Sequence, residues 1–309
     1  METTRLAPSP TGALHLGNAR TFLINWVLAR RSGWRILLRI EDLDGPRVKP
    51  EAIDQTIRTL AWLGLDWDGQ PRIQSQDFEP HAQAVAELAL AGLAYPCELT
   101  RSQIAEAASA PHGPSAPAEV TRPSPLKPSA FDRRDTNWRF ASPPGIVCFE
   151  DGVAGVVTSE PAREAGDFVI WTKRGTPAYQ LAVVVDDAAQ GVTQVVRGDD
   201  LLESTGQQIL ICRALGLLPI PAYTHLPLVL GPDGRRLAKR HGDTRLTVYQ
   251  QGGVAVERVI GLLASWSMPD QPRQAMDLAE FAERFELDTM PRGPARFTPE
   301  DDAWLLGRC

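Results

Sequence analysis

The first forty residues contain a strand, a glycine-rich turn, a helix and a second strand, and this order restricts the fold more than any other feature. Residues 3–7 are suited to a short strand, and residues 35–40 (RILLRI) resemble a buried one. Between them, apolar residues from Leu16 onward recur at helical spacing until Gly33. A strand–helix–strand unit pairs its strands in parallel through a right-handed crossover. The sequence therefore predicts an α/β fold around a parallel sheet.

The rest of the chain alternates between helical and strand-like patterns. We expect helices at about 50–63, 79–91, 201–216, 254–267 and 277–285. We expect short strands over WRF, VCFED, GVVTS, DFVIWTKRG and AYQLAVVVDDA, and at 193–197 and 226–230. Residues 109–130 hold six prolines and predict a surface loop. The expected organisation is an α/β core with a β-leaning insertion and a helical C-terminal part.

Charge and cysteine usage limit the possible partners and compartment. The formal net charge of −6 means that a nucleic acid would have to be bound by local basic groups. No apolar run approaches the ~18–20 residues that cross a bilayer, and the N-terminus METTR lacks a signal core. Four widely spaced cysteines suit a reducing environment. We expect a cytoplasmic monomer without membrane contact, with Cys148 and Cys212 in the core and Cys309 exposed.

The first turn, RLAPSPTGALHLGN (residues 5–18), has the properties of a phosphate site. Pro8 and Pro10 stiffen the exit from the first strand, while Gly12 and Gly17 allow close backbone approach. A helix N-terminus attracts anions, and His15 stands just before the expected helix. An ordinary strand-to-helix turn would have the same composition. The turn alone therefore leaves its function open.

A second glycine-rich stretch, GPDGRRLAKRHG (residues 231–242), follows the expected strand at 226–230. It carries five basic or imidazole side chains, namely Arg235, Arg236, Lys239, Arg240 and His241. A solvated hairpin tip would explain this pattern as well. A second phosphate-suited segment after a second core strand favours a shared anion site.

Five stretches in this order resemble the class I aminoacyl-tRNA synthetases of the glutamate type. They are RLAPSPTGALHLGNAR, similar to the HIGH signature; LRIEDLD (38–44); AYQLAVVVDD (178–187); VVRGDDLLEST (195–205); and RRLAKRHG, similar to the KMSKS loop. The match is nearest to the shortened branch, the glutamyl-queuosine tRNA(Asp) synthetases. The resemblance implies a Rossmann-type catalytic domain that activates L-glutamate with ATP, accompanied by Mg²⁺.

The resemblance also assigns residues. His15 and Lys239 would be catalytic, and the ATP site would comprise Pro8, Gly12, His15, Gly17, Asn18, Arg236 and Lys239. The KMSKS match is imperfect, because Arg236 and Ala238 replace its first Lys and its Ser. Glutamate would be held by Arg5, Ser9, Glu41, Tyr179 and Arg197. Arg197 would read the side-chain carboxylate, although both arginines have the alternative of a structural ion pair. We expect Asp199 and Asp200 to cap the following helix.

The expected domain boundaries follow from this family pattern. The two halves of the catalytic domain would cover 1–95 and 177–245, an acceptor-binding-like insertion 96–176, and a helical stem-contact-like part 246–309. Many shortened relatives hold zinc through a Cys-x-Cys pair that begins where Cys97 stands. Here Leu99 takes the second position, and His112 adds too few ligands. We therefore expect no zinc.

The resemblance to the shortened branch implies transfer of glutamate to queuosine in the anticodon loop of tRNA(Asp). Basic residues of the insertion suited to phosphate contacts are Arg101, Lys127, Arg133, Arg134 and Arg139. Two alternatives stay open: a truncated glutamyl-tRNA synthetase that charges a tRNA 3′ end, and a non-catalytic paralogue that binds tRNA or glutamate. The intact His15, Lys239, Glu41 and Arg197 argue against the paralogue.

Overall fold

The first half of the parallel sheet is formed by the N-terminal strand–helix–strand unit. The computed structural model describes residues 1–10, 12–43, 48, 50–99, 122–132, 134–237 and 244–308. Strand β1 (Thr3–Leu6) leads through α1 (Leu16–Arg31) to β2 (Arg35–Ile40), and β2 pairs in parallel with both β1 and β3 (Arg72–Ile73). Helix α2 (Pro50–Trp62) makes the second crossover. The predicted parallel α/β unit is confirmed.

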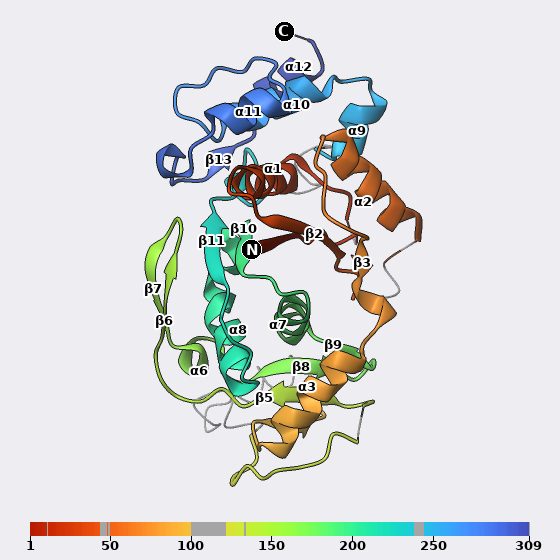
Figure 1. Ribbon diagram of the computed structural model, residues 1–309, viewed down its shortest axis with the longest axis vertical. Coiled ribbons are helices and arrows are strands. Elements are labelled where there is room, and N and C mark those ends of the chain that lie inside the picture. Colours follow the sequence, from red (N-terminus) through yellow and green to blue (C-terminus); the bar gives the residue numbers. More distant parts are fainter. Residues whose placement is uncertain are drawn as a thin grey trace.

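The second half of the sheet lies against the first. Strand β10 (Gln194–Gly198) pairs in parallel with β11 (Ala222–Leu226), and η3 (Asp199–Leu201) and α8 (Leu202–Ala214) connect the two strands. Just before β10, the Thr193 amide donates to the Thr3 carbonyl at 2.9 Å, which brings β10 beside β1. Because β1, β2, β10 and β11 are parallel, their carboxyl ends meet at one edge of this layer. Figure 1 shows these strands at the centre of the molecule.

The middle of the chain adds antiparallel strands, most of which lie below the parallel strands in the view of Figure 1. One antiparallel sheet is formed by four strands, β4 (Ala94–Cys97), β5 (Asn137–Phe140), β8 (Phe168–Thr172) and β9 (Thr176–Pro177). This sheet packs against the helices α3 (Glu79–Leu90) and α7 (Tyr179–Ala189). The short 3₁₀ helix η2 (Gln74–Gln76) precedes α3. A hairpin of β6 (Val147–Asp151) and β7 (Gly155–Ser159), followed by α6 (Pro161–Glu164), touches the parallel layer where Asp151 pairs with Tyr223 of β11. The predicted β-leaning insertion is confirmed.

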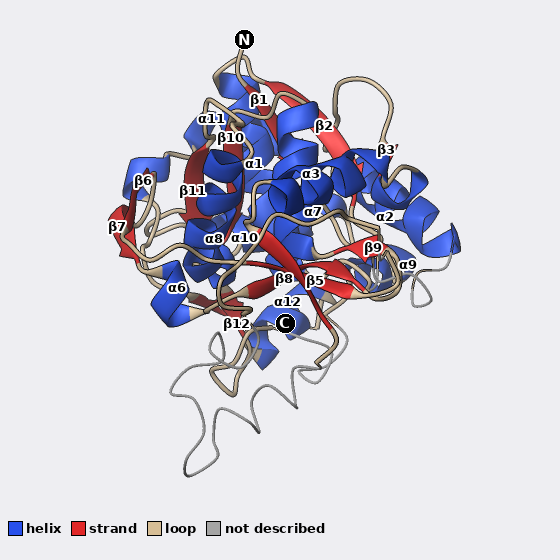
Figure 2. Ribbon diagram, turned by 90° about the horizontal axis from the view of Figure 1, so that it is seen from below, coloured by secondary structure: helices blue, strands red, loops and turns tan. Residues whose placement is uncertain are grey.

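The C-terminal part is helical (Figure 2) and covers the end of the molecule opposite α3 (Figure 1). It contains α9 (Leu246–Gln251), α10 (Val256–Ser265), α11 (Leu278–Arg284), η5 (Leu287–Thr289) and α12 (Pro299–Leu305). Strand β13 (Ala295–Arg296) pairs in parallel with β12 (Val229–Leu230) in a two-stranded sheet of their own, which ties this part to the segment that follows β11. Leucines, valines and aromatic residues of α1, α10, α11 and α12 share one core. Among the described residues, no helix combines the length and apolar character that crossing a bilayer requires.

Expectations about two elements and about one cysteine were wrong. The segment AYQLAVVVDDA contains α7 rather than a strand, because its β-branched run lies on a helix that packs against both the insertion and the catalytic half. The strand expected at 226–230 divides at Pro227, which has no amide hydrogen for the ladder, into β11 and the short β12. Cys148 is exposed, since it lies on the outer face of the β6–β7 hairpin. Cys212 is buried as expected, and Cys309 lies outside the described residues.

Candidate active site

One pocket at the carboxyl edge of the parallel strands collects nearly all of the residues singled out in the sequence. Its volume is about 380 Å³, and it lies among β1, β10, α1, α7 and the segment that follows β2. The predicted residues that line it are Arg5, Pro8, Ser9, His15, Gly17, Asn18, Glu41, Tyr179, Arg197 and Arg236. Gly12 is not part of the wall, and Lys239 lies outside the described residues. Segments more than 200 residues apart in sequence, such as those of Arg5 and Arg236, therefore share one concave surface.

His15 is the N-cap of α1 and faces the pocket. Its Nδ1 accepts hydrogen bonds from the amides of Gly17 (3.1 Å) and Asn18 (3.4 Å), while the Asn18 side chain accepts the His15 amide at 3.3 Å. This reciprocal arrangement is a capping box. Because Nδ1 accepts, the ring proton of a neutral His15 is on Nε2, which none of these bonds uses. His15 thus offers one N–H donor to a ligand.

The electrostatics of this turn keep His15 neutral. Burial, together with the nearby charge of Arg236, lowers the pKa of His15 to about 4. Gly17 leaves room for the ring in this position, since an added Cβ would lie 3.0 Å from His15 Cε1 and 3.1 Å from Nδ1. No such crowding exists at Gly12, where an added Cβ meets nothing within 4 Å. The two glycines of the turn therefore differ in purpose.

The backbone amides at the start of α1 are not available as the sequence suggested. The Leu16 amide donates to the Thr244 carbonyl at 3.2 Å, and the next two amides donate to the His15 ring. The capping box satisfies the groups that usually bind an anion at a helix start. An anion here would meet the His15 Nε2–H and the positive end of the helix dipole instead.

The described residues on either side of 238–243 are attached near His15. On the N-terminal side, the Leu237 amide donates to the Val229 carbonyl at 2.9 Å. On the C-terminal side, the Leu246 amide donates to the Leu14 carbonyl at 2.8 Å, and Arg245 forms a β-bridge with His15. The second basic motif therefore lies between two segments that are anchored in the fold: Leu237, bonded to β12, and Leu246, the first residue of α9.

Asp199 and Asp200 do not cap the following helix as expected. They form the 3₁₀ turn η3, and neither η3 nor α8 has a side-chain cap at its N-terminus. Asp200 instead lines the pocket and forms an ion pair with Arg236. The reason is geometric, because the turn that follows β10 directs the Asp200 carboxylate toward the segment after β12.

Two of the three predicted charged glutamate ligands belong to a buried ion network. The Arg5 Nε donates to Asp187 Oδ1 at 3.3 Å, and Arg39 Nη1 donates to the same oxygen at 2.6 Å. Arg39 also pairs with Glu41 Oε1 at 3.0 Å. Burial raises the pKa of Glu41, an effect that the charges of Arg39 and Arg5 oppose. The structural ion pair considered for Arg5 therefore exists, although Arg5 also lines the pocket. Sequence reasoning missed Asp187 because α7 was expected to be a strand, and it missed Arg39 because the partner of a buried arginine in β2 could not be read from the strand pattern.

Arg197 is bound differently. Its Nε donates to His225 Nε2 at 3.0 Å, its Nη2 donates to Thr205 Oγ1 at 2.9 Å, and its guanidinium lies 5.4 Å from the centre of the Tyr223 ring. Its partners are uncharged, and no carboxylate among the described residues is within ion-pair distance. Burial lowers the pKa of Arg197 from its ordinary value. Arg197 is therefore a buried cation whose charge the described part of the chain does not compensate.

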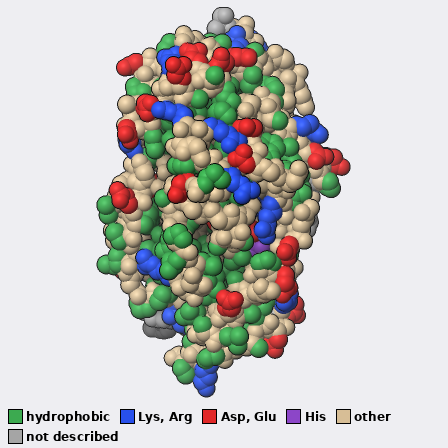
Figure 3. All heavy atoms as spheres, viewed as in Figure 1, with side chains coloured by type: hydrophobic (Ala, Val, Ile, Leu, Met, Phe, Trp, Pro, Cys, Tyr) green, Lys and Arg blue, Asp and Glu red, His purple; other side chains and the backbone are tan. Residues whose placement is uncertain are grey.

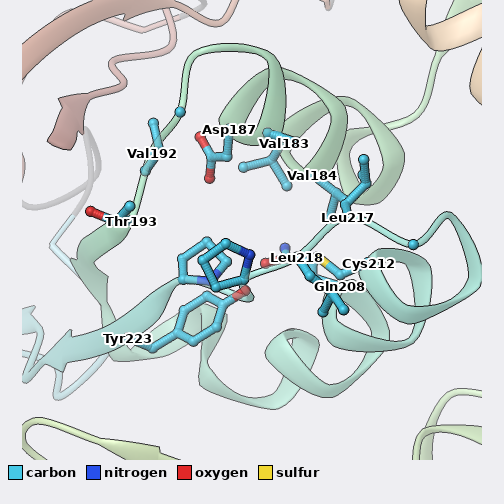
Figure 4. A pocket seen from close by; sticks show the side chains of 15 residues that line it. Val183, Val184, Asp187, Val192, Thr193, Gln208, Cys212, Leu217, Leu218 and Tyr223 are labelled. Carbon is cyan, nitrogen blue, oxygen red and sulfur yellow. The ribbon is translucent and has the colours of Figure 1, made fainter. Parts of the chain in front are cut away.

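A second pocket lies behind the ion network. It has a volume of about 260 Å³ and is lined mainly by apolar side chains of α7, α8 and the loop before β11 (Figure 4). Asp187, its one charged lining residue, is already bonded to Arg5 and Arg39. Because Arg5 and Arg39 already balance the charge of Asp187, this pocket lacks the convergent polar groups that a reaction needs. The first pocket is the better candidate.

The basic residues suggested for phosphate contacts have different environments. Lys127 is exposed, and Arg134 forms an ion pair with Glu79 at 3.4 Å. Arg139 is buried and donates to the Asp167 carbonyl, so it cannot serve on the surface. Arg101 and Arg133 lie outside the described residues. Figure 3 shows Lys and Arg side chains scattered among acidic and apolar ones on one face of the molecule.

The described part of the chain offers few ligands for zinc. Cys97 is buried in β4, and the described residues contain no group of three or more His, Cys, Asp or Glu side chains suited to a metal. His112 lies outside those residues. The expected absence of zinc stays a prediction.

Comparison with known proteins agrees with the fold and the pocket. The family model for the catalytic domain of class I tRNA synthetases (E and Q) matches residues 2–302. The chain belongs to this family and is an enzyme of the ligase class. Among named proteins, it is similar to the Glutamyl-Q tRNA(Asp) synthetase of Symbiobacterium thermophilum, with 46% identity over 98% of both chains.

Full-length synthetases are similar as well. The Glutamate–tRNA ligase of Oleidesulfovibrio alaskensis is 40% identical over 99% of this chain and 65% of its own length. A solved Glutamate-tRNA synthetase from Elizabethkingia anophelis superposes with a TM-score of 0.78, at 25% identity, over 99% of this chain and 70% of the other. The Rossmann-type fold predicted from the motifs is thus shown.

Proposed function

We propose that the protein activates L-glutamate with ATP in the absence of tRNA, and then transfers the glutamate to the queuosine base in the anticodon loop of tRNA(Asp). The observation that carries the proposal is that one pocket joins the N-terminus of α1 to Arg197, a buried cation with uncharged partners among the described residues. The name of the relative with 46% identity over 98% of both chains supports the choice of acceptor.

In this proposal the ATP phosphates lie along the HIGH-like turn. The His15 Nε2–H donates to an α-phosphate oxygen, while Arg236 and Lys239 balance the charge on the β- and γ-phosphates. Pro8, Gly17 and Asn18 complete the wall on this side. We keep Gly12 as a residue that shapes the turn rather than a ligand contact. ATP would enter as its Mg²⁺ complex.

The glutamate would lie between β1, β2 and β10. Arg197 binds the side-chain carboxylate, because it is the cation whose charge is not balanced within the described pocket. Both bonds from Arg39 to Glu41 end on Oε1, so Oε2 is oriented by this pair and left to accept the ammonium. Tyr179 and Ser9 supply hydroxyl groups, and Arg5, whose charge is paired with Asp187, forms part of the same wall of the pocket.

The reaction is an attack of the glutamate α-carboxylate on the α-phosphorus, which forms glutamyl-adenylate and releases pyrophosphate. Such a transfer depends on positioning and on stabilisation of the charge that develops on the phosphates. Removal of one preorganised donor of this kind costs about 10²–10³ in rate. A hydroxyl of the acceptor then attacks the acyl carbon, and AMP leaves.

The decisive experiment measures transfer of radiolabelled glutamate to tRNA(Asp) with and without queuosine. We expect transfer only to the queuosine-containing tRNA, and the label should persist when the tRNA lacks its 3′-terminal adenosine. Labelling that requires this adenosine, or that favours tRNA(Glu), would instead support a tRNA-charging enzyme, as the 40% identical glutamate–tRNA ligase suggests.

A further inference from the structure

A buried chain of hydrogen bonds connects the β6–β7 hairpin to the glutamate side of the pocket. Asp151 ends β6, His225 lies in β11 and Arg197 lies in β10. Asp151 Oδ2 is 2.6 Å from His225 Nδ1, and His225 Nε2 is 3.0 Å from Arg197 Nε. The side chains of Asp151 and His225 are completely inaccessible to solvent. Three strands that come from distant parts of the sequence therefore contribute one residue each.

The chemistry of the three groups determines the direction of every bond. Burial alone would raise the pKa of Asp151, but hydrogen bonds from the His225 side chain and from three backbone amides hold it at about 2. An ionised carboxylate can only accept, so His225 Nδ1 carries the ring proton. His225 Nε2 then accepts, which suits the Arg197 N–H that faces it. Burial lowers the pKa of His225, and this keeps the ring neutral.

This arrangement holds Arg197 without neutralising it. A carboxylate in direct contact would fix the guanidinium equally well but would cancel its charge, as Asp187 does for Arg5. The neutral imidazole and the hydroxyl of Thr205 occupy Nε and Nη2, and none of their bonds uses Nη1. The guanidinium keeps both its orientation and its full positive charge toward the pocket.

We propose that Asp151 and His225 are positioning residues, which fix Arg197 to bind an anionic substrate side chain and thereby set the preference for glutamate over its uncharged amide, glutamine. The substrate assignment in this statement rests on the function proposed above. Neither residue lines the pocket. Their effect is exerted through Arg197 alone.

Two substitutions test the chain at different bonds. Asp151→Asn can present an amide N–H to His225 Nδ1, which moves the ring proton of His225 to Nε2. The Nε2–H and the Arg197 Nε–H would then face each other as two donors without an acceptor. His225→Phe removes the acceptor altogether, whereas His225→Gln restores an acceptor at nearly the same place. We expect D151N and H225F to weaken glutamate binding about tenfold or more, and H225Q to recover part of this loss. The KM for ATP should not change.

A second buried pair provides a matched control. His81 Nε2 lies 3.2 Å from Asp186 Oδ1, and both side chains are fully buried but line neither pocket. His81→Phe removes a buried imidazole from a carboxylate just as H225F does. It should lower the thermal midpoint by a similar amount while leaving the glutamate KM and the glutamate-to-glutamine ratio of kcat/KM as in the wild type.

The readouts separate this inference from the proposed function. Calorimetry measures L-glutamate binding directly, ATP–pyrophosphate exchange measures activation, and ¹⁵N NMR of the His225 ring reports which nitrogen is protonated. If the wild-type protein binds glutamate but does not activate it, the proposed function is refuted and the positioning role is not. Unchanged glutamate affinity and selectivity in folded D151N and H225F, or a ring proton on Nε2 in the wild type, would overturn the positioning role. Absence of glutamate binding would overturn both.

Discussion

His15 serves two purposes with the two nitrogens of one ring. Nδ1 closes the capping box of α1, and Nε2 presents a donor to the pocket. The ring can do both only because it is neutral and because Gly17 leaves room for it. At the scale of a single residue, the geometry of the turn is thus coupled to the proposed phosphate contact.

Gly17→Ala tests this coupling. The new Cβ would push the imidazole away by a few tenths of an ångström or more, so we expect amino-acid activation to fall about 100-fold. Helix propensity predicts no loss of stability, because alanine is the better helix former. Gly293→Ala, where an added Cβ meets nothing within 4 Å, is the control. Normal ATP–pyrophosphate exchange in G17A would show that the ring position is unimportant.

The protonation state of His15 gives a second prediction. With five histidines in the chain, NMR can follow each ring, and an H15Q spectrum assigns the signal. We expect a midpoint at about pH 4 rather than near the ordinary 6.5. Between these values the unfolded chain binds a proton that the folded chain does not, so His15 makes the free energy of unfolding decrease as pH falls from 6.5 toward 4. A midpoint above 6 would contradict the neutral donor.

At the scale of elements, α10 packs exceptionally closely on the segment that leads to α11. The Met276 amide donates to the Glu257 carbonyl at 2.9 Å, and a Cβ built on Gly261 would lie 1.8 Å from the Gln274 carbonyl oxygen. Backbone cannot move aside as a flexible side chain can. The small residue is therefore what allows the C-terminal helices to share a core with α1.

Gly261→Ala should separate these elements. We expect the free energy of unfolding to drop by about 3 kcal/mol or more, since either the helix or the 274–276 segment must shift. Urea unfolding followed by circular dichroism measures the loss, again with Gly293→Ala as the control. A G261A protein with the unfolding midpoint of the wild type would mean that α10 is not docked in this way.

The elements also show how far sequence patterns lead. The parallel unit around α1 was predictable, because a glycine-rich turn and a 3.6-residue period both point to it. The identity of α7 was not, since a run of three valines suits a buried strand equally well until its packing is known. That one error concealed Asp187, and with it the ion network behind Arg5. The short helices α9 and α12 were missed because fewer than two turns leave little periodicity.

At the scale of the whole molecule, the site depends on contacts between distant segments. Arg5 and Asp187 are 182 residues apart, and Arg39 joins them from a third segment. Motif order in the sequence predicted which residues meet at the pocket, but it carried no information on how their charges are balanced. That depends on pairings that no motif reveals, such as those of Arg39, which lies inside LRIEDLD, and of His225, which lies outside the five stretches.

Asp187→Asn tests this long-range network. The substitution leaves Arg39, whose side chain is fully buried, with one charged partner instead of two, and it removes the ion pair of Arg5. We expect a loss of about 3–5 kcal/mol in the free energy of unfolding. Glu280→Gln, in an exposed pair with Arg284, should cost less than about 1 kcal/mol. Equal effects of the two variants would contradict a structural role for the network.

The account as a whole depends on one pocket that binds ATP phosphates at one end and an anionic amino acid at the other. Exchange of labelled pyrophosphate into ATP, measured without tRNA for each amino acid in turn, tests this most directly. We predict exchange with L-glutamate, at a rate about 100-fold or more above that with glutamine. No exchange with glutamate, or equal exchange with glutamine, would contradict the account.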